Sequence, residues 1–327
     1  MARSTFYDQM AANRRNAFLL TLAVVALLGA LGFAVGYALT GDPAGAIGAT
    51  GIALAVGLVM SLGSYFAGDQ LVLAASNAKE VDEASAPQLM NVVREMAIAA
   101  NIPMPRVHVI DDSAPNAFAT GRDPKHASIA VTTGLLEKLD REELQGVIGH
   151  ELAHVRNLDI RFSLIVGVLV GSIALLSDFF LRFTFWGGAG RRDRDRDGGG
   201  GGGLQIIMLV VAMVLAILAP IAARFVQLAV NRQREYLADA SSVEITRNPL
   251  GLERALAKIT SDREVLEVAN RATQHLYFTN PIKKFETRAS GLFSTHPPIV
   301  ERINRLRELT GERPLAETDV AALAELE

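Results

Sequence analysis

No cysteine occurs among the 327 residues of this chain. This absence excludes disulfide bonds, a thiol nucleophile and a zinc site held by thiolates. Any zinc site must therefore be built from histidine and carboxylate side chains. Histidine is scarce as well, since the chain contains only six. Two histidines at a metal-ligand spacing are therefore a specific signal.

The chain also lacks an excess of charge of one sign. It has 32 Lys and Arg residues against 35 Asp and Glu residues, for a formal net charge of −3. Such a chain offers no basic surface for a polyanion, and we expect no nucleic acid among its partners. Hydrophobic residues make up 50% of the sequence, which is high for a soluble enzyme of this length.

Four long stretches contain almost no charged side chain. They cover residues 17–40, 44–67, about 162–181 and 204–223. About 20 apolar residues suffice to cross a bilayer as a helix. We therefore predict four transmembrane helices, arranged as two hairpins.

These hairpins divide the chain into four parts. Residues 1–68 hold a polar tail and the first hairpin, and residues 160–230 hold the second, with an Arg/Asp/Gly-rich loop at 187–203. The remaining parts, residues 69–159 and 231–327, are the two portions of a soluble domain.

His150 and His154 are four residues apart, so on a helix they lie on one face and can hold one metal ion. A helix is expected here, because Asp140 and Glu143 have the spacing of a capping box. Glu151 follows the first histidine and can act on a metal-bound water. Chance would produce this spacing in about one chain in a hundred of this length. The pattern therefore predicts a zinc site.

A catalytic zinc usually has three protein ligands. A third histidine six residues beyond His154 is excluded, because Ile160 stands there. Glu235 on a later helix is a candidate, and it shares a helical face with Asp239, which could orient a ligating histidine. The alternative is that Glu235 is an ordinary solvent-exposed acid.

Residues 106–110 and 127–132 have the composition of short β-strands. A small sheet beside the metal-binding helix could accept an extended peptide at its edge. The alternative is that both are ordinary core strands.

Three separated motifs, at residues 149–154, 232–239 and 294–302, resemble the HtpX family of membrane zinc metalloproteases, relatives of the CAAX prenyl proteases. The resemblance implies a mainly α fold, in which four transmembrane helices join a gluzincin-like α+β protease domain with a small edge sheet. The segment from Asn116 to Gly121 also resembles the family, which implies that Asn116 and Ala117 contact the substrate.

The resemblance further implies one Zn²⁺ per chain, bound by His150, His154 and Glu235. Glu151 would be the catalytic acid/base that assists attack of a zinc-bound water on the peptide bond, and His296 a second catalytic residue near the substrate. The expected partners are the lipid bilayer and protein substrates. These substrates would be misfolded or damaged membrane proteins and unfolded cytoplasmic segments, cleaved in stress-related quality control. Nothing in the sequence indicates an oligomeric state.

The alternative is a membrane protein with a zinc site but no protease activity, either a metal transporter or a scaffold. Transporters usually place ionisable residues inside their spans, whereas the four stretches here are almost free of charge. A scaffold has no need of Glu151.

Charge around the first span predicts the orientation. Arg14 and Arg15 precede it, and the short loop after it offers only Asp42, so the N-terminus should be cytoplasmic. Four spans return both soluble portions to that side. We therefore expect a multi-pass protein of the bacterial cytoplasmic membrane with its active site facing the cytoplasm. Against this, several arginines around the 187–203 loop would lie outside.

This orientation can be tested by cysteine labelling, because the chain has no cysteine of its own. A single cysteine placed within residues 198–203 should react with a membrane-impermeant reagent added to whole cells. One placed beside Arg156 should react only after the membrane is opened. The reverse pattern would invert the topology.

Overall fold

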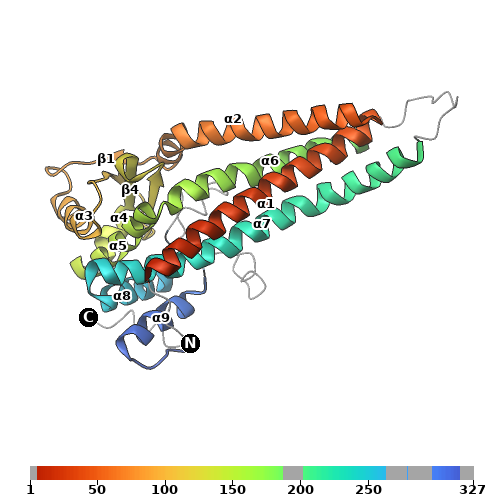
Figure 1. The fold of residues 1–327 in the computed structure, drawn as a ribbon. Coiled ribbons are helices and arrows are strands. Elements are labelled where there is room, and N and C mark those ends of the chain that lie inside the picture. The colour runs from red at the N-terminus through yellow and green to blue at the C-terminus, as the bar shows by residue number, and fades with distance from the viewer. Residues whose placement is uncertain (1–5, 187–201, 263–277, 279–296, 317–327) are drawn as a thin grey trace. The chain divides into compact units, whose positions relative to one another are not determined.

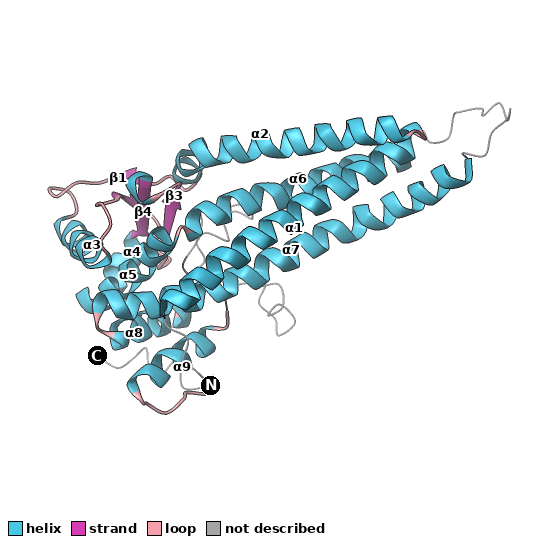
Figure 2. Ribbon diagram, viewed as in Figure 1, coloured by secondary structure: helices cyan, strands magenta, loops and turns pink. Residues whose placement is uncertain are grey.

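The computed structural model describes residues 6–186, 202–262, 278 and 297–316 (Figures 1 and 2). The chain forms two compact units, each built from separated segments. The helical unit contains residues 14–64 and 164–229, and the α/β unit contains residues 1–13, 65–163 and 230–327. Both His150 and Glu235 belong to the α/β unit.

The prediction of four membrane-spanning helices is confirmed: four described helices are long and apolar enough to cross a bilayer. They are α1 (Phe6–Thr40), α2 (Pro43–Ala75), α6 (Asp159–Trp186) and α7 (Gly202–Thr246). Their buried residues form one apolar cluster, to which α1, α6 and α7 contribute Leu28, Ile173 and Ala216. Many other apolar side chains on these helices are exposed, as a lipid-facing surface requires.

Small residues let α1 and α2 approach closely within the helical unit. A Cβ added at Gly36 would lie 2.6 Å from the Ala49 Cβ, and one added at Gly32 would lie 3.1 Å from the Ala53 Cβ. Transmembrane helices commonly pack through close backbone approach at glycine and alanine, because lipid provides no hydrophobic driving force for two helices to associate.

The α/β unit contains a four-stranded mixed sheet in the order β1-β2-β4-β3. Its strands are β1 (Lys79–Glu80), β2 (Arg106–Ile110), β3 (Ala117–Gly121) and β4 (Ala127–Thr132). β2 and β4 match the two strands expected from the sequence and pair in parallel, while β3 pairs antiparallel with β4 and lies at the edge. The segment at 117–121, whose strand character the sequence did not reveal, is therefore one of the two edge strands of the described sheet, opposite β1, and is called the edge strand below.

The other described helices of the α/β unit pack around the sheet and around one another, and one of them carries the predicted metal-binding motif. They are α3 (Pro87–Ala100), α4 (Thr133–Lys138), α5 (Arg141–Asn157), α8 (Pro249–Ser261) and α9 (Ile299–Thr310), with a short 3-10 turn, η1 (Pro124–His126). α5 begins where the sequence predicts, at a complete Asp140–Glu143 capping box. It ends at Leu158, whose left-handed backbone (φ 64°) separates α5 from α6. This break sets the position of Asp159.

Gly146 lets α5 contact its neighbours through the backbone. A Cβ at this position would lie 2.6 Å from the Leu252 backbone nitrogen of α8, and the Gly146 carbonyl accepts a hydrogen bond of 2.7 Å from the Ser242 hydroxyl of α7. The helix that carries both histidines is thereby held against α7 and α8.

We predict that Gly146→Ala destabilises the protein, because the added methyl meets backbone atoms that cannot rotate away. Overpacking of this kind costs about 1–3 kcal/mol, which should lower the melting temperature of the detergent-purified protein by several degrees. Gly63→Ala is the control, since a Cβ there meets nothing within 4 Å. Equal melting temperatures for the two variants would contradict the close contact.

Candidate metal centre

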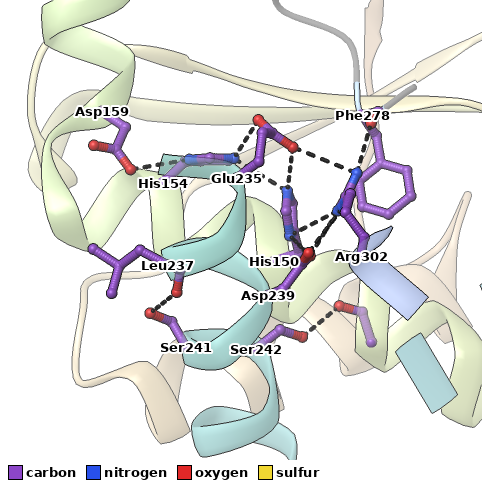
Figure 3. Close-up of polar contacts among 11 residues, drawn as sticks. His150, His154, Asp159, Glu235, Leu237, Asp239, Ser241, Ser242, Phe278 and Arg302 are labelled. Carbon is purple, nitrogen blue, oxygen red and sulfur yellow. Dashed lines mark hydrogen bonds and ion pairs between the residues drawn. The ribbon is translucent and has the colours of Figure 1, made fainter. Parts of the chain in front are cut away.

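His150 and His154 lie one helical turn apart on α5 and point to the same place (Figure 3). Their Nε2 atoms are 3.1 Å apart, and their rings meet edge to face with centroids 4.7 Å apart. Two nitrogens bound at about 2.0–2.1 Å to one tetrahedral zinc are roughly 3.3 Å apart. The histidine geometry therefore fits a shared metal ion.

Glu235 of α7 completes the group from a distant part of the chain. Its Oε2 lies 3.5 Å from His150 Nε2, and its Oε1 lies 3.5 Å from His154 Nε2. One ligand atom from each of the three residues lies within 4.8 Å of the others. Glu235 is buried, so the interpretation as an ordinary exposed acid does not hold. Two imidazoles and one carboxylate are a donor set that suits zinc.

Glu151 is buried beside this group. Burial raises the pKa of its carboxyl, although His150 and His154 act in the opposite direction. Its carboxylate accepts a hydrogen bond from the Ala119 backbone N–H. Since Ala119 lies on β3, the edge strand contacts Glu151.

Each histidine is oriented by a carboxylate on its other ring nitrogen. Asp239 Oδ1 lies 2.9 Å from His150 Nδ1, and Asp159 Oδ2 lies 3.1 Å from His154 Nδ1. Such contacts select the tautomer that leaves Nε2 available to a metal. Asp239 was expected in this role, whereas Asp159 was missed. It is five residues from His154, a spacing at which helical side chains do not meet, and only the break at Leu158 brings the two together.

Two buried arginines hold these carboxylates in turn. Arg302 of α9 donates to both oxygens of Asp239, at 2.9 Å and 2.7 Å, and its Nη1 lies 3.4 Å from Glu235 Oε2. Burial would raise the pKa of Asp239, but Arg302 and His150 outweigh it and hold that pKa below its usual value. Arg234 Nε lies 3.4 Å from Asp159 Oδ1. Both arginines lie within the motifs at 232–239 and 294–302, but neither was assigned a role in the site.

Phe278 links the site to the edge strand. Its ring meets the His150 ring edge to face at 4.9 Å, and its backbone N–H donates to the Ala117 carbonyl at 2.7 Å. Its own carbonyl faces Arg302 Nη1 at 3.5 Å. The Ala117 carbonyl and the Ala119 N–H of β3 therefore both have hydrogen-bond partners elsewhere in the chain.

Three residues predicted to contact the substrate or assist catalysis remain to be placed: Asn116, Ala117 and His296. Asn116 is buried directly before β3, where its Oδ1 accepts a hydrogen bond from the Ala117 N–H at 3.0 Å. Ala117 is thus the first residue of the strand that contacts Glu151 and Asn116 directly precedes it, and the contact of both with substrate stays a prediction. His296 lies outside the described residues.

Comparisons with known proteins agree with this geometry. The model of Peptidase family M48 matches residues 83–310. The chain is 46% identical to the "Protease HtpX homolog" of Streptococcus gordonii and 48% identical to that of Streptococcus pneumoniae. Each alignment covers 93% of this chain and 99% of the relative.

The fold also resembles a solved structure. The crystal structure of S. mikatae Ste24p superposes with a TM-score of 0.50 at 20% identity, covering 78% of this chain and 57% of that one. The mainly α architecture with a small sheet is therefore shared with Ste24p. With four apolar helices and a profile match over most of its length, the chain belongs to Peptidase family M48 and is a membrane metalloprotease.

Proposed function

We propose that this chain is a zinc-dependent endopeptidase of the bacterial cytoplasmic membrane, with one zinc ion held by His150, His154 and Glu235. The observation that carries the proposal is the convergence of these three side chains around one point, with Glu151 buried beside them. Zinc bound there would polarise the scissile carbonyl and lower the pKa of a water ligand to about 7.

The chain's own residues then have distinct tasks. Glu151 takes a proton from the attacking water and returns it to the leaving amine. Its hydrogen bond from Ala119 keeps the carboxylate aimed at the site. Asp239 and Asp159 keep the two imidazoles in the ligating tautomer. For His296, the resemblance to the HtpX family supports a position near the substrate.

The proposed substrates are misfolded membrane proteins and unfolded cytoplasmic segments. The long helix α7 supports this assignment, because it contains the uncharged stretch 204–223 and also Glu235. At 1.5 Å per residue, Glu235 lies roughly 18 Å along the helix from Ala223. A metal held there is outside the apolar stretch, where chain segments leaving the bilayer can reach it. A transporter would instead need ligands within the stretch.

The first test separates catalysis from metal binding. Glu151→Gln should abolish cleavage of an unfolded protein substrate, because the base is lost, while zinc content measured by atomic absorption stays near one per chain. Glu244→Gln is a matched control, since its side chain pairs with Arg156 on the surface at 2.8 Å. Normal cleavage by Glu151→Gln would refute the mechanism.

The second test concerns the ligand set. Glu235→Ala should lose both zinc and activity, because two protein ligands rarely retain a catalytic zinc. Asp239→Ala and Asp159→Ala should weaken zinc affinity by about 10–100-fold, measured by competition with a chelator. Glu244→Ala, on the same helix as Glu235 and Asp239, should change little. Full zinc occupancy in Glu235→Ala would show that another residue completes the site.

A further inference from the structure

A second pocket, of about 370 Å³, lies in the α/β unit between the soluble end of α2 and one end of the sheet. Its walls include Phe66 and Asp69 of α2, Arg106 at the start of β2, and three basic residues after β3. These three are Arg122, Lys125 and His126. None of these residues belongs to the metal centre.

The pocket carries an excess of positive charge. Arg106 pairs with Asp69 at 3.2 Å, and Asp123, just outside the pocket, lies 3.8 Å from Arg122 Nε and 2.8 Å from His126 Nδ1. Lys125 is exposed, and its ammonium group has no partner among the described residues. Three permanent cations thus face two carboxylates. The pocket therefore favours an anion, and Lys125 is available to bind it.

The position of the pocket along α2 indicates where this anion comes from. Residues 44–68 of α2 contain no charge, and Asp69 is the first charged side chain after them. Phe66 is 60% exposed, and the Arg122 guanidinium lies 5.7 Å from the centroid of its ring. Basic side chains placed where an apolar stretch ends are typical of contact with anionic headgroups, and the exposed apolar ring of Phe66 beside them can lie against lipid.

We propose that this pocket binds the phosphate group of an anionic membrane phospholipid. Lys125, Arg122 and Arg106 would surround the phosphate, and Phe66 would lie against the lipid beside its headgroup. Arg106 would turn from Asp69 toward the phosphate or contact both. Such a site would tie the turn after β3, and with it the edge of the sheet, to the lipid surface.

Native mass spectrometry of the full chain in detergent tests this proposal. The unmodified protein should retain phosphatidylglycerol at concentrations at which phosphatidylcholine is lost. Each basic residue near an anionic lipid surface changes affinity by roughly fivefold. Lys125→Gln should therefore weaken phosphatidylglycerol binding by about fivefold, and Lys125→Gln with Arg122→Gln by about 25-fold.

Lys79→Gln is the matched control, because Lys79 is exposed on β1 and does not line the pocket. It should bind phosphatidylglycerol as the unmodified protein does. Melting temperatures of all variants identify any loss of fold, and Lys125→Gln removes no contact that the structure describes. Equal retention of the two lipids, or equal loss in Lys79→Gln and Lys125→Gln, would overturn the proposal. Displacement of the lipid by millimolar inorganic phosphate would also overturn it, in favour of a free-phosphate site.

Discussion

The metal centre depends on a buried set of ion pairs that surrounds its ligands. Asp239 accepts two hydrogen bonds from Arg302 and contacts His150 through the same carboxylate. A buried charge is costly unless it is paired and hydrogen-bonded. Asp239 and Arg302 satisfy each other, and their fixed geometry leaves His150 one orientation. Asp159 likewise contacts His154, and Arg234 lies 3.4 Å from its carboxylate and donates to its backbone carbonyl at 3.2 Å.

This arrangement requires that α5, α7 and α9 stay close together. α5 contributes both histidines, α7 contributes Glu235 and Asp239, and α9 contributes Arg302. Because Gly146 and Gly149 have no side chain, α7 and α8 can approach the backbone of α5 closely. The Ser242 hydroxyl of α7 donates a hydrogen bond to the Gly146 carbonyl. Backbone contact leaves little freedom to slide. The precision of the ligands therefore comes in part from small residues on α5 that lie next to His150 or one helical turn before it.

The edge strand connects the site to the rest of the α/β unit. β3 holds Glu151 through the Ala119 N–H and holds Phe278 through the Ala117 carbonyl. The turn after β3 then carries the basic residues of the second pocket. One short strand thus lies between the proposed catalytic base and the proposed lipid site. Any displacement of β3 would change the contact that aims Glu151.

The sequence alone determined what depends on local spacing. Stretches of 20 or more residues with almost no charge predicted the four apolar helices. A capping box predicted the start of α5, and the four-residue spacing of His150 and His154 placed them on one face. The shared face of Glu235 and Asp239 even suggested their joint role. Each of these features follows from helix periodicity or bilayer thickness, which act over a few turns of chain.

Only the tertiary structure decided which distant groups meet. Arg302 contacts its partner Asp239 from 63 residues away, and nothing in the local pattern around an arginine on an amphipathic helix distinguishes it from a surface residue. The position of Asp159 beside His154 depends on the left-handed backbone of one residue, Leu158. The strand at 117–121 is stabilised by its pairing with β4. Such contacts follow from the packing of whole elements, in which a buried polar group must find a partner wherever the fold supplies one.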